Sequence, residues 1–251
     1  MENKKEIKII DIHMHLGPCN VFDCNIEEGD LFKAMEDYNI ETFILQLLPG
    51  VADYKKGNDR ILDICKNNKG KFYGIVAINP HITEEDYFIE VERLLKTGYF
   101  KGIKLNSAGW AVNPLSNDAT KVFMASKKYG VPLMCHTGVG IPWALPSMLF
   151  PRAKEYPDLN IVVAHAGNTQ NYATEALIGA QLFDNMYLET SWTSISDKLA
   201  FFNSLGSKRI LFGSDVPLNT PGEICHYKSL NLKDTDLKNI FSENAKNLYK
   251  I

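Results

Sequence analysis

The first apolar run of the chain reads Ile7-Lys8-Ile9-Ile10-Asp11-Ile12-His13-Met14-His15. Such a run predicts a β-strand, and side chains alternate between the two faces of a strand, so both imidazoles point the same way. The opposite face carries Ile10, Ile12 and Met14, which suits a strand backed by a helix. Neutral imidazole is a common metal ligand, so His13 and His15 form half of a candidate metal site. The alternative is a pair of ordinary histidines, and the rest of the chain decides between the two.

Beyond this run, short apolar segments alternate with amphipathic segments to the end of the chain. Strands are predicted at 7–15, 42–48, 72–79, 99–106, 131–138, 160–168, 185–192 and 209–216. Helical patterns fall at about 30–40, 58–69, 84–97, 118–129, 144–156, 172–183, 196–205 and 234–250. Eight strand–helix units without a linker predict one (β/α)8 TIM barrel over residues 1–251. A doubly wound open sheet is the alternative, but no glycine-rich phosphate loop follows the first strand.

Composition narrows the class of protein. The chain has 251 residues, 45% of them hydrophobic and 23% charged, which is typical of a soluble globular protein. Its net charge is −3 without a basic block, so nothing favours nucleic acid or a membrane as a partner. No apolar run is long enough to span a bilayer, and the charged start is unlike a signal peptide. Five scattered cysteines favour reduced thiols, and we therefore expect a cytoplasmic protein.

Polar side chains gather where the predicted strands end, which is where the chemistry of a barrel lies. Four of the six histidines and one carboxylate are among them. Taken singly, each is more simply a core histidine or a capping aspartate, but their coincidence favours a site. Imidazole and carboxylate suit zinc, and also manganese, iron or nickel. The residues are His13 and His15 on the first strand, Lys104 on the fourth, His136 on the fifth, His165 on the sixth and Asp215 on the eighth.

The order of these motifs resembles the amidohydrolase superfamily. It runs from His13-x-His15 through Ile103-Lys104-Leu105, Cys135-His136-Thr137-Gly138 and Ala164-His165-Ala166-Gly167 to Phe212-Gly213-Ser214-Asp215-Val216-Pro217. The segments 155–167 and 242–249 are similar to the amidohydrolase 2 branch, whose relatives include aminocarboxymuconate-semialdehyde-type decarboxylases. The resemblance covers the whole chain.

The resemblance implies a role for each of these residues. His13, His15 and Asp215 correspond to ligands of one metal ion, and His136 to a further ligand. His165 corresponds either to a ligand of a second metal or to a histidine that orients or deprotonates the attacking water. Asp215 is also the usual proton acceptor. Lys104 corresponds to a carbamylated bridge between two metals, to a free lysine held away from one metal, or to a substrate-binding group. We expect one zinc ion, with another divalent transition metal as the alternative.

Aromatic and amide side chains follow several strands and predict a substrate pocket. Trp110, Trp143 and Trp192 lie just past strands, as do Asn106 and Asn168. We expect these five to bind a planar or ring substrate, although the tryptophans would also suit local loop cores. Arginine is scarce, and only Arg60, or less readily Arg152, is placed to approach the rim. This scarcity weakens the case for a strongly anionic substrate.

Together these observations favour a metal-dependent hydrolase that cleaves an amide, lactone or ester bond of a small substrate, cyclic ones included. Activated water attacks the carbonyl, and Asp215 carries the proton to the leaving group. Two alternatives stay open, a non-oxidative decarboxylase on the same metal site and a metal-binding barrel without catalysis. We predict a small-molecule substrate, with no nucleic-acid or membrane partner. A homo-oligomer is compatible with the sequence.

Overall fold

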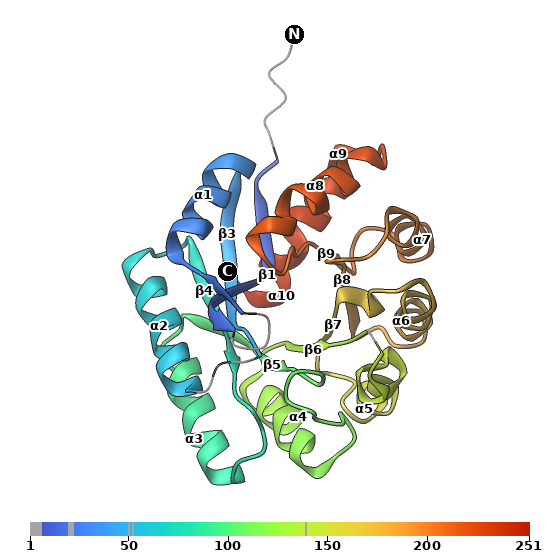
Figure 1. The fold of residues 1–251 in the computed structure, drawn as a ribbon. Helices are drawn as coiled ribbons and strands as arrows, with labels where there is room; N and C mark the ends of the chain where they lie inside the picture. The colour runs from blue at the N-terminus through green and yellow to red at the C-terminus, as the bar shows by residue number, and fades with distance from the viewer. Residues whose placement is uncertain (1–6, 20–22, 50, 52, 139) are drawn as a thin grey trace.

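A curled sheet of nine strands forms the centre of the computed structural model, which describes residues 7–19, 23–49, 51, 53–138 and 140–251 (Figure 1). The strands lie in the order β2-β1-β3-β4-β5-β6-β7-β8-β9, and every neighbouring pair is parallel except β1 with β2. Eight strands lie where the sequence predicts them. The short β2 is an addition, because a three-residue segment shows no periodicity. The bounds are β1 (Ile9–Cys19), β2 (Cys24–Ile26), β3 (Ile40–Leu47), β4 (Phe72–Ala77), β5 (Phe100–Leu105), β6 (Leu133–His136), β7 (Ile161–Ala164), β8 (Met186–Glu189) and β9 (Ile210–Leu211).

Backbone hydrogen bonds connect β1 with the segment that follows β9. The amide of Ile12 donates to the carbonyl of Phe212, and that of His15 to the carbonyl of Asp215, both at 3.1 Å. In return, the amide of Asp215 donates to the carbonyl of His13 at 2.6 Å. The two histidines of the first strand and an aspartate 200 positions later therefore lie on adjacent segments.

The described residues form ten α-helices, and all but α10 lie around the outside of the strands (Figure 1). Within the segment predicted as one helix at 144–156, a 3-10 turn at Pro146–Leu149 precedes α5, because Pro146 and Pro151 each fit only the first turn of a helix. Helix α8 was not predicted. No helix in the described ranges has the length and apolarity that a membrane crossing needs. The bounds are α1 (Glu28–Tyr38), α2 (Tyr54–Asn67), α3 (Glu84–Leu95), α4 (Asn117–Tyr129), α5 (Phe150–Glu155), α6 (Gln170–Leu182), α7 (Ile195–Leu205), α8 (Thr220–Ser229), α9 (Asp234–Lys238) and α10 (Asn244–Tyr249).

The strands carry apolar side chains on both faces. An outer cluster packs between the strands and the surrounding helices. An inner cluster contains Ile44, Ile75 and Met134 from three strands, together with Leu248 and Tyr249 of α10. Helix α10 thus packs against the inner side chains of the sheet. Strands buried on both faces are typical of parallel sheets covered by helices.

The helix-backed face predicted for the first strand is wrong for Ile10 and Ile12 and is confirmed for Met14. Ile10 and Ile12 belong to the inner cluster, whereas Met14 belongs to the outer one. The pairing of β1 with β3 shifts register between Asp11 and Met14. An irregularity of this kind re-aims side chains. Because of this shift, Ile10 and Ile12 can face the inner cluster while the histidines that follow them face the site.

Candidate functional site

Three side chains from the two ends of the chain converge on one point. The Nε2 atoms of His13 and His15 lie 3.2 Å and 3.0 Å from the same oxygen, Oδ1 of Asp215. In this group, and in a second group formed by His13, His165 and Glu189, one donor atom from each residue lies within 4.8 Å of the others. This spacing between donor atoms suits ligands that share one metal ion.

The outer nitrogens of both imidazoles bind acceptors. Nδ1 of His13 lies 2.6 Å from Oε2 of Glu189, and Nδ1 of His15 lies 2.9 Å from the carbonyl oxygen of Leu47. Since both partners only accept, each ring carries its proton on Nδ1 and turns the lone pair of Nε2 toward Asp215. Burial lowers the pKa of His13 well below its ordinary value, so this ring is neutral. Two lone pairs facing an anionic oxygen repel it unless a cation lies between them, so this donor set fits a divalent metal ion.

Asp215 is held in its anionic form. Burial by itself raises the pKa of Asp215, but positive charge at His13 and His15 lowers it well below its ordinary value, and a metal ion bound to the two neutral rings would supply that charge. Its second oxygen, Oδ2, accepts a hydrogen bond from the indole Nε1 of Trp192 at 2.9 Å. One carboxylate oxygen therefore faces the histidines while the other faces the indole.

His165 and His136 form a second layer beside this group. Nδ1 of His165 lies 2.8 Å from Oγ of Ser191, whose hydroxyl donates to Glu189 at 3.0 Å. Nε2 of His165 lies 3.2 Å from Nδ1 of His136. Burial lowers the pKa of His165 to about 4 and that of His136 well below its ordinary value. Both rings are therefore neutral at physiological pH.

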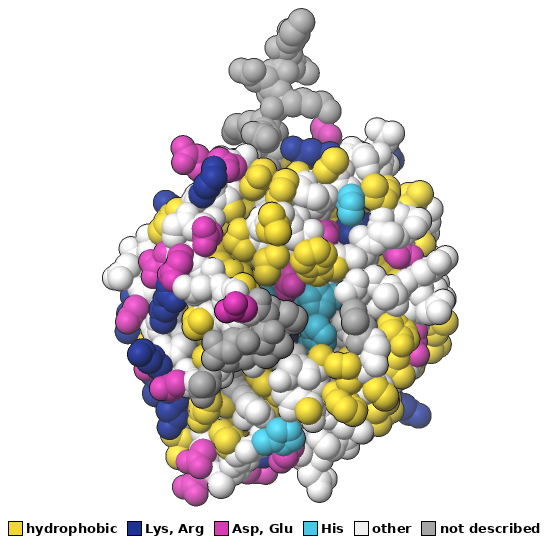
Figure 2. All heavy atoms as spheres, viewed as in Figure 1, with side chains coloured by type: hydrophobic (Ala, Val, Ile, Leu, Met, Phe, Trp, Pro, Cys, Tyr) yellow, Lys and Arg dark blue, Asp and Glu magenta, His cyan; other side chains and the backbone are white. Residues whose placement is uncertain are grey.

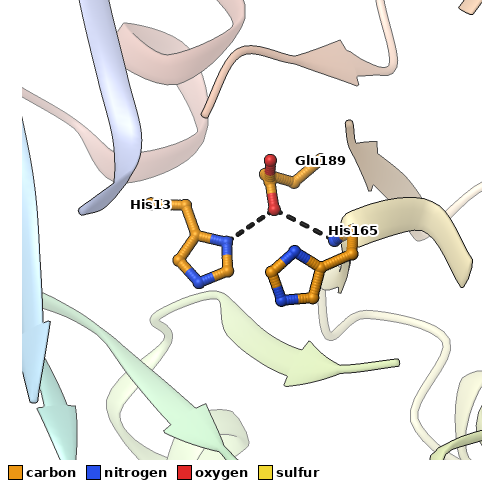
Figure 3. A group of neighbouring side chains, drawn as sticks. All are labelled: His13, His165 and Glu189. Carbon is orange, nitrogen blue, oxygen red and sulfur yellow. Dashed lines mark hydrogen bonds and ion pairs between the residues drawn. The ribbon is translucent and has the colours of Figure 1, made fainter. Parts of the chain in front are cut away.

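Glu189 is a site residue that the sequence analysis missed. Its carboxylate is fully buried at the end of β8 and accepts from Nδ1 of His13 and the backbone amide of His165, as Figure 3 shows. It also accepts from the amide and hydroxyl of Ser191, at 2.6 Å and 3.0 Å. The available signal was its position, because Glu189 follows Tyr187-Leu188 at a strand end, where the other site residues also lie.

The side chain of Lys104 lies among the histidines and carboxylates of the site. It forms no ion pair with an acidic residue in the described part of the chain. It is 1% exposed, and its Nζ lies 3.2 Å from Nε2 of His13. Burial lowers the pKa of Lys104 to about 8, against the opposing charges of Asp215 and Glu189. A considerable fraction of this amine is therefore neutral near pH 8.

A cavity of about 520 Å³ opens above these residues. Figure 2 shows histidine side chains in a hollow near the middle of this face, with hydrophobic side chains around it. Three predicted substrate-binding residues, Asn106, Asn168 and Trp192, line the cavity. Leu48 and Ile141 contribute apolar side chains to the wall of the cavity.

The other two tryptophans do not line this cavity, and their role in substrate binding stays a prediction. Trp110 packs against the outer hydrophobic cluster and borders a neighbouring cavity of about 310 Å³. Trp143 lies in a 3-10 turn, and its indole nitrogen is buried without a hydrogen-bond partner among the described residues. For Trp110 the structure thus supports packing in a local core.

Several residues around the pocket have a left-handed backbone. The φ angles are 63° at His165, 62° at Asn168, 65° at Trp192 and 71° at Asp215. Residues other than glycine rarely adopt this region, and such strain clusters at functional sites. Here it turns the side chains at the ends of three strands toward one pocket.

Comparison with known proteins identifies the family. A sequence model of the amidohydrolase family matches residues 10–251. No curated protein matches the chain by sequence.

Solved structures share the fold at low sequence identity. A dihydroxybenzoic acid decarboxylase from Polaromonas sp. JS666, with bound manganese and the inhibitor 2-nitroresorcinol, has a TM-score of 0.76 and 19% identity, covering 98% of this chain and 97% of that chain. For 5-carboxyvanillate decarboxylase from Sphingomonas paucimobilis the values are 0.77 and 14%, covering 98% and 100%. An uncharacterised Tim-barrel protein from Bordetella bronchiseptica gives 0.79 and 17%, covering 96% and 98%.

The family match begins one residue after the start of β1 and includes all the later strands. It also spans all the side chains that meet at the pocket. The resemblance seen in the order of the motifs is thereby confirmed. This chain belongs to the amidohydrolase family.

Proposed function

We propose that this protein is a metal-dependent decarboxylase that acts on a small carboxylic acid carrying a ring. The observation that carries the proposal is the pocket itself, where a histidine–aspartate donor set lies beside an apolar and aromatic wall. Solved structures of similar fold include decarboxylases of dihydroxybenzoic acid and of 5-carboxyvanillate. This support favours the decarboxylase alternative over the hydrolase that the sequence alone favours.

His13, His15 and Asp215 are the residues that would hold the metal ion, with His136 or His165 beside them. When bound, a divalent cation such as manganese or zinc would supply positive charge for the oxygens of an acidic substrate. The arginines do not supply that charge. Arg60 pairs with Glu27 at 2.5 Å, and the buried Arg152 bonds to the carbonyl of Pro114 at 2.9 Å.

The side chains of the pocket have separate tasks in this proposal. Leu48, Ile141 and Trp192 pack against the ring and exclude water. Asn106 uses its side-chain oxygen to accept from the amide of Gly109 at 2.9 Å, which leaves its amide group to donate to substrate. When the bond to the carboxyl group breaks, its electron pair stays on the ring carbon, which must take up a proton. We assign relay of that proton to Asp215, whose carboxylate borders the pocket and would first accept a proton from the acidic substrate or from water.

We also infer that the eight parallel strands form a closed barrel. The backbone bonds between β1 and residues 212–215 support this closure. It would fix the distance between the first and last strands and hence between the candidate ligands.

Product analysis tests the proposed function. The manganese-loaded protein would be incubated with hydroxybenzoic acids and other carboxylated rings, and separately with lactones and cyclic amides. Release of carbon dioxide from a ring acid, with the lactones left intact, is the expected result. Cleavage of lactones or amides without release of carbon dioxide would contradict the decarboxylase and support a hydrolase instead.

A further inference from the structure

A buried ion pair lies behind Trp192, outside the cluster of candidate ligands. Nζ of Lys198 on α7 lies 2.9 Å from Oε2 of Glu223 on α8, and the two side chains are 0% and 1% exposed. The same ammonium donates to the carbonyl oxygens of Thr190 and Thr193 at 2.8 Å and 2.7 Å. Lys198 therefore fixes the backbone on both sides of Trp192.

The other oxygen of Glu223 connects Trp192 with the segment of Asp215. Oε1 accepts from the backbone amide of Trp192 at 2.8 Å and from the side chain of Asn219 at 3.1 Å. The same side-chain nitrogen of Asn219 donates to the carbonyl of Ser214 at 3.0 Å. Glu223 thus holds Trp192 directly, and through Asn219 it holds the residue before Asp215.

Trp192 needs such support because its own conformation is unfavourable. Its φ of 65° lies in the left-handed region, and a residue held there costs about 1–3 kcal/mol unless its surroundings impose it. Its side chain is not buried to stabilise the core, since the residue is 44% exposed at the pocket. What the conformation achieves is the 2.9 Å hydrogen bond from its indole to Oδ2 of Asp215.

The buried pair is poorly explained by stability alone. Removing two charges from water costs about as much as their attraction returns, so apolar residues of similar volume often stabilise a fold equally well. A buried ion pair that also bonds to the backbone does fix one geometry, however, and here Lys198 bonds to two carbonyls and Oε1 of Glu223 to one amide. The geometry fixed here is that of the loop carrying Trp192.

We propose that Trp192 is a positioning residue for Asp215, and that the Lys198–Glu223 pair holds Trp192 in the conformation that this task requires. The indole fixes one carboxylate oxygen, so the other stays directed at His13 and His15. The inference shares with the proposed function only the assignment of Asp215 as a metal ligand. Partners that orient a ligand in this way commonly change metal affinity about 10–100-fold when they are removed.

Manganese affinity, measured by calorimetry without substrate, tests the role of Trp192. In Trp192→Phe the ring is kept and the donor is lost, so we expect the Kd for Mn²⁺ to rise about 10-fold or more. The melting temperature of the metal-free protein should stay within a few degrees. Trp143→Phe is the matched control, because its indole nitrogen has no partner among the described residues, and it should bind Mn²⁺ like wild type. Wild-type affinity in Trp192→Phe would overturn the proposal.

A double-mutant cycle tests the ion pair. Replacing both charges, in Lys198→Met with Glu223→Leu, should weaken Mn²⁺ binding to a similar degree as Trp192→Phe. Adding Trp192→Phe to that variant should cause little further loss, because both changes act through one hydrogen bond. The role of the pair would be overturned if the fold-losses in Mn²⁺ affinity multiplied in the combined variant. It would also be overturned if the charge-free variant bound Mn²⁺ like wild type.

A second variant covers the case in which the charge-free protein does not fold. Glu223→Asp keeps a negative charge beside Lys198, but its shorter side chain withdraws the oxygen from the amide of Trp192. A double-mutant cycle of Glu223→Asp with Trp192→Phe must show the same non-additive loss of Mn²⁺ affinity. The readout also separates this inference from the proposed function. A protein that shows this coupling but releases no carbon dioxide would support the inference and refute the decarboxylase.

Discussion

Oε2 of Glu189 lies 2.6 Å from Nδ1 of His13, and both side chains are fully buried although 176 positions separate them in the chain. This contact decides the tautomer of the imidazole that contributes to both groups of metal-type donors. A carboxylate in this position orients a ligating histidine and increases its basicity. Glu189 also accepts the backbone amide of His165, so one buried charge aligns two histidines from different strands.

Glu189→Gln should lower metal affinity about 10–100-fold, because the amide keeps the size of the side chain but removes the charge that orients His13. Calorimetric titration with Mn²⁺ and Zn²⁺ measures the effect. Glu155→Gln is the control, since Glu155 is 51% exposed and pairs with Arg152 away from the pocket. Equal affinities in the two variants would contradict this role for Glu189.

Protein purified without chelators should carry about one divalent transition metal ion per chain, as three protein ligands with an open position predict. Elemental analysis gives the ratio. Dialysis against a chelator should lower the melting temperature, because the ion binds the folded state alone, and Zn²⁺ or Mn²⁺ should restore it. A folded preparation that neither contains nor takes up such an ion would argue against the metal centre.

Asp215→Asn keeps one oxygen ligand but removes the group assigned to proton delivery. Turnover should fall by about 10²-fold or more, in line with the contribution of a positioned acid or base. Asp118→Asn serves as the comparison, because Asp118 pairs with His81 at 2.7 Å on the partly exposed rim. If Asp215→Asn turned over like wild type, another group would have to move the proton, and His165 would be the first to test.

Lys104 decides whether the site holds one ion or two. We expect one, with Lys104 unmodified, so Lys104→Met should keep a metal-to-protein ratio of about one. The pKa of about 8 leaves part of the amine neutral, however, and that form reacts with carbon dioxide to give a carbamate. About two ions per wild-type chain, an added carbamate mass and a gain on adding bicarbonate would show the bridged form instead.

Asp11 gives the metal-free fold a dependence on pH. Burial raises the pKa of Asp11 to about 8, although hydrogen bonds from Ser214 and His13 act against burial. In the unfolded chain an aspartate ionises near pH 3.9, so between about pH 4 and 8 only the unfolded state has lost the proton. The stability of wild type relative to Asp11→Asn should therefore fall as pH rises through this window, by up to about 1.4 kcal/mol per pH unit. Denaturation of both metal-free proteins at several pH values measures it, and a constant difference would contradict the shift.

Periodicity predicts most of this fold because strands and helices bury one face or two in a regular pattern. It also locates the polar residues at strand ends, and the structure brings His13, His15, His136, His165 and Asp215 together. What it misses depends on contacts between distant segments. Glu189 was overlooked because a single carboxylate in a strand has no local mark of burial. Helix α8, which carries Glu223, was missed because its apolar residues follow no clear helical spacing.

Irregular backbone accounts for the remaining differences between the predicted and the observed positions. The shift between Asp11 and Met14 breaks the alternation from which the faces of β1 were predicted. The left-handed φ at Trp192 turns this ring to the pocket, whereas the loops of Trp110 and Trp143 place theirs elsewhere. Sequence spacing contains no information on either feature, because both depend on contacts between segments that are far apart in the chain.

The hydrogen bonds that join β1 to the segment after β9 also have a consequence for biosynthesis. A growing chain presents the two imidazoles first, but the carboxylate that completes the proposed ligand set is made 200 residues after His15. An unfinished chain therefore offers at most a weak two-histidine site. Tight uptake of the metal ion would mark only those molecules whose synthesis has passed Asp215, and would leave prematurely terminated ones unloaded.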